Sequence, residues 1–245
     1  MGINYGGKTD IGLKRETNQD FFSVEKLGED KLLFTVCDGM GGAKGGSEAS
    51  RLCNETFTCY IKENIGSCDK SEYISLLQRA LCTANTSVRR KALLSKEFEG
   101  MGTTLVSAVF DGDKYYLIWV GDSRIYAISD FKIKQLSHDH SFVQSLVDNG
   151  SITEKEAKLH PNRNIITKAV GIEEEISGDV CEISAENLDG ILLCSDGLCG
   201  YVSERDISEA VRTEKDAEKC CDRLVELANA AGGHDNITVV VHKKQ

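Results

Sequence analysis

The sequence predicts a layered α+β fold in which helices cover the outer faces of antiparallel β-sheets. Two observations predict it. Short β-rich runs recur along the chain, and two long segments between them carry apolar residues at helical spacing. Strands gathered into hairpins, with amphipathic helices inserted between the groups, bury their apolar faces by packing as layers.

Six runs rich in β-branched and aromatic residues are expected to form strands. They are residues 31–37, 103–110, 114–120, 124–128, 191–194 and 237–242. The second and third runs are separated by Asp111-Gly112-Asp113, which is typical of a hairpin turn. We therefore expect these two runs to pair as neighbours.

Two segments are expected to be helical because their apolar residues recur every three or four positions. Within the long stretch 43–98, the predicted buried face comprises Ile74, Leu77, Leu81, Ala84 and Val88. In the stretch 216–230, it comprises Ala217, Cys220, Leu224 and Leu227. Residues 141–171 are polar and carry the only proline, so they are expected to form a surface excursion that flanks a site.

Composition narrows the class of protein. The 245 residues fit one domain covering 1–245, because no linker or repeat marks a boundary. A net charge of −10 disfavours nucleic acid and anionic membranes as partners. No apolar run approaches the roughly 18–20 residues that cross a bilayer, and no signal peptide precedes the domain, so we expect a cytoplasmic protein. The ten cysteines are read as reduced structural thiols, with a redox or metal role as the alternative.

Four aspartates stand beside apolar strand-like runs. Asp38 and Asp196 each follow such a run and precede a glycine, Asp122 follows Ile118-Trp119-Val120-Gly121, and Asp235 precedes the last run. One such residue is most simply a turn residue, because aspartate is a poor strand former. Four of them can converge when strands share a sandwich, and converging carboxylates repel one another, which raises a pKa or demands a cation. Oxygen ligands favour Mg²⁺ or Mn²⁺.

Arg15 lies in a polar segment before a strand-like run and is a candidate ligand for phosphate, with a surface ion pair as the simpler alternative. The glycine-rich stretch 38–46 does not match a nucleotide-binding loop, since Lys44 is followed by neither Ser nor Thr. Its glycines instead permit a tight turn close to metal ions. Carboxylate-held metals with an arginine describe a site for phosphoester hydrolysis.

Seven short motifs, in this order, resemble the metal-dependent protein phosphatases of the type 2C (PPM) family, especially its compact bacterial members. They are Gly12-x-x-Arg15-x-x-Asn18-x-Asp20, Val36-Cys37-Asp38-Gly39-Met40-Gly41-Gly42, Met101-Gly102-Thr103-Thr104, Val120-Gly121-Asp122-Ser123-Arg124, Ser137-His138-Asp139-His140-Ser141, Cys194-Ser195-Asp196-Gly197-Leu198 and Gly233-His234-Asp235-Asn236-Ile237-Thr238. The resemblance implies a four-layer α-β-β-α sandwich of two antiparallel sheets flanked by helices.

The resemblance also implies roles for single residues. Asp38 would bridge two metal ions, Asp196 and Asp235 would complete the first, and the Gly39 carbonyl with water held by Asp20 would serve the second. Asp122, with Asp196, would hold a third, weaker ion. Arg15 would bind the substrate phosphate. A water bridging two Mn²⁺ or Mg²⁺ ions would attack phosphorus, and residues 141–171 would be a flap that tunes substrate choice.

One departure from the family concerns the proton donor to the leaving group. Members often carry a histidine two or five residues after the bridging aspartate, where this chain has Met40 and Ala43. Loss of a general acid typically costs about 10²–10⁴-fold in rate. A metal-bound water, His140 or slow turnover would each account for the departure.

The expected function is therefore metal-dependent hydrolysis of phosphoserine and phosphothreonine in proteins, opposing a cognate Ser/Thr kinase. We expect a monomer whose partners are phosphoproteins. Two other readings remain: an inactive relative that binds phosphoproteins, and a phosphoesterase for nucleotides or nucleic acid. The acidic positions that match metal ligands disfavour the first, and the net charge of −10 disfavours the second.

Overall fold

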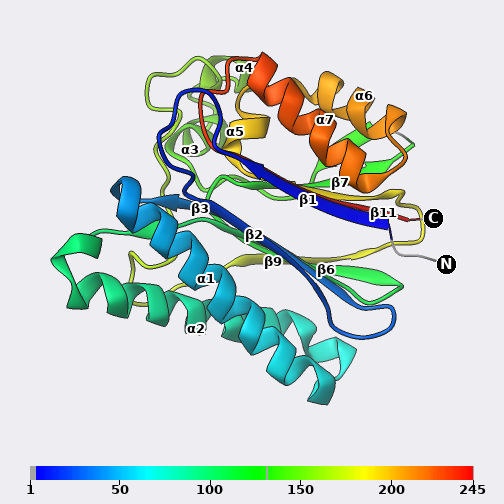
Figure 1. The fold of residues 1–245 in the computed structure, drawn as a ribbon, viewed down its shortest axis with the longest axis horizontal. Helices are drawn as coiled ribbons and strands as arrows, with labels where there is room; N and C mark the ends of the chain where they lie inside the picture. Colours follow the sequence, from blue (N-terminus) through cyan, green and yellow to red (C-terminus); the bar gives the residue numbers. More distant parts are fainter. Residues whose placement is uncertain (1–3, 131, 245) are drawn as a thin grey trace.

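In the computed structural model, the chain forms two antiparallel sheets packed face to face, with helices on the outer side of each (Figure 1). The structure describes residues 4–130 and 132–244, without the side chain of Ala43. The predicted fold class, an α+β sandwich of two antiparallel sheets flanked by helices, is confirmed.

Each strand belongs to one of the two sheets. One sheet has the order β1 (Asn4–Asp10), β11 (Ile237–Lys243), β10 (Gly190–Cys194), β7 (Arg124–Ser129) and β8 (Lys132–Gln135). The other has the order β2 (Asp20–Lys26), β3 (Leu32–Met40), β5 (Leu105–Phe110), β6 (Lys114–Val120) and β9 (Asp179–Ser184), with β4 (Gly102–Thr103) paired to the end of β3.

Each of the six predicted strands is present, and the Asp111-Gly112-Asp113 turn joins β5 to β6. Strand β2 contains the strand-like run that follows Arg15, and three strands were not predicted: β1, β8 and β9. All three lie at sheet edges, where one side of the strand meets solvent. Their sequences are correspondingly polar, with few of the residues that favour buried strands.

Helices cover both outer faces. Figure 1 shows α1 (Gly42–Asn64) and α2 (Tyr73–Leu94) on the β2–β9 sheet, and α6 (Glu204–Thr213) and α7 (Ala217–Ala230) on the other. The predicted face of α2 is buried apart from Ile74, which is partly exposed. Shorter helices are α3 (Phe142–Asp148), α4 (Glu154–Ala157) and α5 (Asp196–Cys199), with 3₁₀ turns at Ile65–Ser67, Lys70–Glu72 and Lys96–Phe98. No helix among the described residues is long and apolar enough to cross a membrane.

The core has three apolar clusters, one between the sheets and one under each pair of long helices. Strand β3 contributes to two of them. Leu33 and Cys37 face the helices, whereas Phe34 and Val36 face the opposite sheet. A central strand buried on both faces reads as a continuous apolar run, which explains why the sequence predicted β3 so readily.

Residues 141–171, called the flap below, leave the sandwich between β8 and β9 and contain α3 and α4. Two isolated β-bridges fix the base of the flap. One pairs Ser141 with Ile166 inside the flap, and the other pairs Val170 of the flap with Thr103 of β4. The flap therefore rises from one fixed base, at the end of the sandwich where α3, α4 and α5 gather (Figure 1).

Candidate metal centre and active site

Four aspartates that the sequence singled out line a single cavity of about 590 Å³ at one end of the sandwich: Asp38, Asp122, Asp196 and Asp235. They come from different strands of both sheets or from the turns beside them. Arg15 and Gly39 line the same cavity. The structure thus brings together the candidate residues that lie far apart in the sequence.

Asp38 lies inside β3, which continues to Met40, so the strand extends three residues beyond the predicted run 31–37. Its backbone is held by Thr103 in β4 and by Thr104, which directly precedes β5. The Asp38 carbonyl accepts hydrogen bonds from the Thr104 amide (2.8 Å) and the Thr103 hydroxyl (2.9 Å). The Asp38 amide donates to Thr104 Oγ1 (2.9 Å). This clamp fixes an aspartate in a strand that would otherwise disfavour it.

Asp20 faces Asp38 directly across the antiparallel pair of β2 and β3. Directly opposed residues have Cβ atoms about 4.5–5.5 Å apart, so register alone makes the two acidic residues neighbours. Asp20 Oδ2 accepts a hydrogen bond from Ser195 Oγ (2.7 Å), and the same Ser195 Oγ accepts from the Thr238 amide (2.9 Å). Asp20 therefore links the two sheets beside the cavity.

Glycine is the only residue type that fits at position 39. A Cβ there would lie 2.0 Å from the Gly46 carbonyl oxygen and 2.7 Å from that of Gln19. Both contacts are with backbone, which cannot move aside cheaply. The close approach of α1 to the end of β3 therefore requires glycine beside Asp38.

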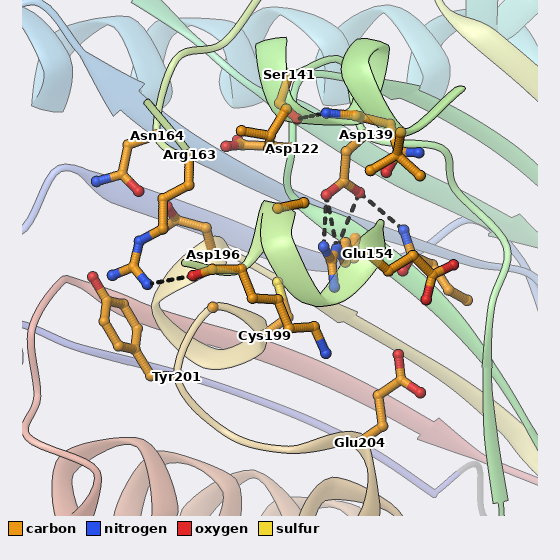
Figure 2. A pocket seen from close by; sticks show the side chains of 18 of the residues that line it. Asp122, Asp139, Ser141, Glu154, Arg163, Asn164, Asp196, Cys199, Tyr201 and Glu204 are labelled. Atoms are coloured by element: carbon orange, nitrogen blue, oxygen red, sulfur yellow. Dashed lines mark hydrogen bonds and ion pairs between the residues drawn. The ribbon is translucent and has the colours of Figure 1, made fainter. Parts of the chain in front are cut away.

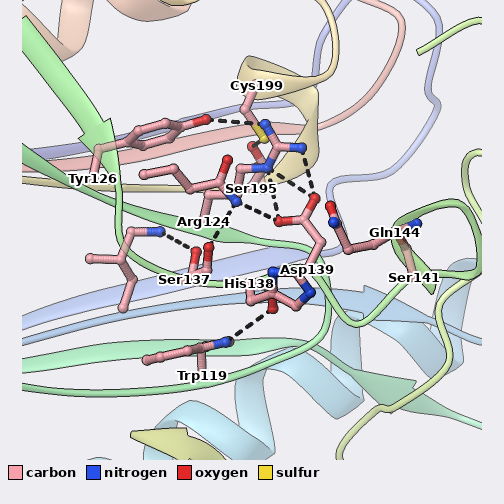
Figure 3. Close-up of polar contacts among 12 residues, drawn as sticks. Trp119, Arg124, Tyr126, Ser137, His138, Asp139, Ser141, Gln144, Ser195 and Cys199 are labelled. Carbon is pink, nitrogen blue, oxygen red and sulfur yellow. Dashed lines mark hydrogen bonds and ion pairs between the residues drawn. The ribbon is translucent and has the colours of Figure 1, made fainter. Parts of the chain in front are cut away.

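The turn that carries Asp122 is held by a buried network, seen in Figure 3. Arg124 donates to both carboxylate oxygens of Asp139, with Nη2 2.7 Å from Oδ2. Ser123 Oγ lies 2.7 Å from Thr104 Oγ1, which joins this turn to the clamp on Asp38. The positions of Asp38 and Asp122 are consequently set by one continuous set of hydrogen bonds.

Asp196 begins α5 directly after β10, and Asp235 stands two residues before β11. Adjacent pairing of β10 with β11 brings the two together. Arg15 Nη2 donates to Asp235 Oδ2 at 2.7 Å. The Arg15 side chain is 49% exposed at the rim of the cavity, so its guanidinium is accessible from solvent.

Burial and mutual repulsion raise the pKa values of the clustered aspartates. Burial, followed by the negative charge of Asp196 and Asp235, raises the pKa of Asp20 to about 7. Burial and the charge of Asp235 raise the pKa of Asp196 to about 6. The pKa values of Asp38 and Asp122 are also raised well above the ordinary range, again mainly by burial and then by neighbouring aspartates. A bound cation would reverse each shift.

The donor set fits a hard metal ion. Asp20, Asp122 and Asp196 each have a buried Oδ1 without a hydrogen-bond partner, which is costly unless a cation offsets it. Among residues 4–130 and 132–244, no three acidic, His or Cys side chains are grouped as a complete set of metal ligands. Asp235, for example, faces Arg15.

A second cavity of about 590 Å³ lies under the flap and shares Asp122, Asn164 and Asp196 with the first. Figure 2 shows Asp122 and Asp139 on one side of it, and Asp196 with Tyr201 on the other. The sequence did not predict this second cavity, although Asp122, Asp196 and the flap, which the sequence did single out, all line it. Its walls come from the flap and from the segment after α5, so a local sequence pattern had no means of pairing them.

His140 does not line either cavity. Its Nδ1 accepts a hydrogen bond from the Gly121 amide (3.1 Å), and its Nε2 lies 3.4 Å from Asp179 Oδ2. Burial lowers the pKa of His140. These contacts make His140 a support for the turn before Asp122 and argue against it as a proton donor to the substrate.

Comparison with known proteins agrees with this geometry. The family model described as Protein phosphatase 2C matches residues 13–240. The serine/threonine phosphatase stp of Listeria monocytogenes is 32% identical over 96% of this chain and 93% of its own length. PstP of Mycobacterium tuberculosis is 36% identical over 98% of this chain but 44% of its own length.

Solved structures agree as well. The serine/threonine phosphatase Stp1 from Staphylococcus aureus superposes with a TM-score of 0.92 at 32% identity, over 100% of this chain and 96% of that one. The catalytic domain of PstP in complex with two manganese ions gives a TM-score of 0.84 at 34% identity, over 98% and 97% of the two chains. The chain therefore belongs to the protein phosphatase 2C family, and the enzyme class predicted from its sequence, a protein serine/threonine phosphatase, is confirmed.

Proposed function

We propose that this chain hydrolyses phosphoserine and phosphothreonine esters in proteins, with two tightly bound Mn²⁺ or Mg²⁺ ions and a third, weaker one. The observation that carries the proposal is the convergence of four carboxylates on one cavity with an accessible arginine at its rim. Unpartnered buried carboxylate oxygens support hard divalent ions. The two manganese ions in the PstP structure favour Mn²⁺.

Each side chain has a proposed role. Asp38 would contribute to both tight ions, with Asp196 and Asp235 completing the first, and the Gly39 carbonyl, together with water held by Asp20, would serve the second. Asp122 and Asp196 would hold the third. When bound, the ion pair supplies a lowered pKa for the water between the ions and offsets charge on the phosphoryl oxygens.

Arg15 binds the phosphate. Its fork-shaped guanidinium forms paired hydrogen bonds with a phosphate as well as with a carboxylate. In this structure it donates to Asp235, and exchanging that partner for a substrate oxygen needs no movement of buried groups because Arg15 is half exposed. At the rim of the cavity, Arg15 contributes to catalysis by orienting the phosphate ester.

The proton for the leaving alkoxide is proposed to come from water. No histidine is present among the described residues that line either cavity. The substrates are proposed to be phosphoproteins made by a cognate Ser/Thr kinase. The chain is proposed to act as a monomeric, single-domain cytoplasmic enzyme, with the flap contributing to substrate choice.

The test is phosphate release from a phosphothreonine peptide by the purified chain, with and without Mn²⁺. We expect release with Mn²⁺, none with a chelator, and loss of both turnover and calorimetric Mn²⁺ binding in Asp38→Asn. Asp113→Asn, which changes an exposed carboxylate in the β5–β6 turn, is the matched control and should behave as wild type. Metal-independent turnover, or an Asp38→Asn enzyme as active as wild type, would refute the assignment.

A further inference from the structure

The flap is held to the body of the molecule at very few points away from its base. In the part of the chain that the structure describes, residues 149–164 make one hydrogen bond, ion pair or ring contact outside the flap. That contact is the Arg163 guanidinium over the Tyr201 ring, with Cζ 5.3 Å from the ring centroid. Figure 2 shows the Arg163 side chain reaching from the flap to Tyr201.

Tyr201 also contacts the loop before β11. Its ring stacks on His234, with centroids 4.9 Å apart and planes inclined by 22°. The His234 ring in turn lies against Gly232, where a Cβ would come within 2.4 Å of Nε2. One aromatic side chain thus joins the flap to the residue that immediately precedes Asp235.

The loop under Tyr201 is a firm support. The Gly233 carbonyl accepts hydrogen bonds from the amides of Leu13 (2.8 Å) and Lys14 (3.1 Å). Asn236 donates its side-chain amide to the carbonyls of Ile11 and Thr17, both at 3.0 Å. These bonds do not involve Tyr201. The loop should therefore keep its shape, and Asp235 its place, when the Tyr201 ring is removed.

Within the flap, α3 is held by His138 through Asp148 (2.8 Å), whereas residues 149–164 above Tyr201 have no comparable support. Between the flap and the segment after α5 lies the second cavity, which Arg163 and Tyr201 both line. Arg163 is itself braced within the flap, because its Nη1 donates to the Lys158 carbonyl (3.1 Å). The contact with Tyr201 therefore engages the segment 158–163 as well as the Arg163 side chain.

We propose that Tyr201 is a positioning residue: it holds the flap, through Arg163, over the cavity beside the metal centre, and so shapes the surface that a substrate protein meets. The metal centre itself does not depend on this contact. Small aryl phosphates need only the metal centre, whereas a phosphoprotein must also fit against the flap. The part of this inference that concerns substrates rests on the proposed function, while the part that concerns the flap does not.

The first test is limited trypsin digestion, which cuts after Lys155, Lys158 and Arg163 when the flap opens. Tyr201→Leu removes the ring and keeps every cleavage site. Tyr201→Phe keeps the ring and is the matched control, since the Tyr201 hydroxyl has no hydrogen bond among the described residues. A cation–π contact at an exposed site corresponds to about a two- to fivefold change in an equilibrium, so cleavage within the flap should accelerate by about that factor in Tyr201→Leu alone.

The second test compares p-nitrophenyl phosphate with a phosphorylated protein. In Tyr201→Leu, KM for the phosphoprotein should rise about two- to fivefold, while kcat, the kinetics with the aryl ester and the Mn²⁺ affinity stay unchanged. Arg163→Gln should raise KM equally, and the double variant should add nothing further.

Equal flap cleavage in wild type and Tyr201→Leu would overturn the proposal. So would a parallel loss on both substrates, because that would assign Tyr201 to the metal centre. If no variant, wild type included, releases phosphate, the proposed function fails, and the digestion alone decides whether Tyr201 holds the flap.

Discussion

The buried ion pair between Arg124 and Asp139 offers a sharp test of how the Asp122 turn is held. Asp139 is 9% exposed, and it accepts three hydrogen bonds from the Arg124 fork, between 2.7 and 3.0 Å. Asp139→Leu would leave a guanidinium largely buried without its counter-charge. Breaking such a pair from one side typically costs about 3–5 kcal/mol, and we expect a loss of unfolding free energy in that range.

Replacing both partners distinguishes an unpaired charge from a loss of packing. The double variant Arg124→Leu/Asp139→Leu should recover most of the stability, because apolar replacements of buried pairs are often close to neutral. Glu97→Leu, which breaks the exposed Lys44–Glu97 pair, is the control and should change stability by less than about 1 kcal/mol. Urea unfolding of the metal-free protein measures all three. A single variant that costs under 1 kcal/mol, or a double variant no more stable than the single one, would refute the reasoning.

Three further predictions concern buried or reacting groups. Burial lowers the pKa of His242 to about 4, so between pH 6.5 and 4 the unfolded chain takes up a proton that the folded chain does not. Stability should fall by about 3 kcal/mol over that window, and His242→Gln should lack this part of the slope in urea titrations at several pH values. Arg15→Ala should raise KM for phosphate esters and leave Mn²⁺ affinity intact, because the Asp235 carboxylate is freed and not removed; a collapse of affinity with unchanged KM would contradict this. Thr104→Val should cost about 1–3 kcal/mol in urea unfolding by stranding the Asp38 amide, and should weaken Mn²⁺ binding in calorimetry; unchanged stability would show that the clamp is redundant.

How much of the fold could be predicted depended on where each strand lies in its sheet. Central strands such as β3 and β10 are buried on both faces, so their sequences are continuous apolar runs that were found without ambiguity. The edge strands β1, β8 and β9 carry polar residues and were missed. Their pairing is decided by the neighbouring strand, which is a tertiary effect that no local pattern reveals.

The same distinction applies to the candidate site. The aspartates were conspicuous because a carboxylate beside an apolar run conflicts with strand propensity, and such local conflicts tend to mark functional sites. The residues that fix the aspartates in place by hydrogen bonds could not be predicted from local sequence patterns. Thr104 and Ser195 act through register between strands far apart in sequence, and the chamber under the flap exists only once the segment after α5 is placed beside it.

The negative charge of the aspartate cluster explains why several hydrogen bonds hold the surrounding strands together. Raised pKa values at Asp20 and Asp196 mean that the folded, metal-free chain binds protons more tightly than the unfolded chain between about pH 4 and 7. The contribution of these two carboxylates to stability must therefore decline as pH rises through that range, opposite in sign to that of His242, and ionised carboxylates push the strand ends apart. The Thr104 clamp and the Asp20–Ser195 bond oppose that repulsion across and between the sheets. A divalent cation removes its cause, so metal affinity and folded-state stability should be two expressions of the same electrostatic free energy.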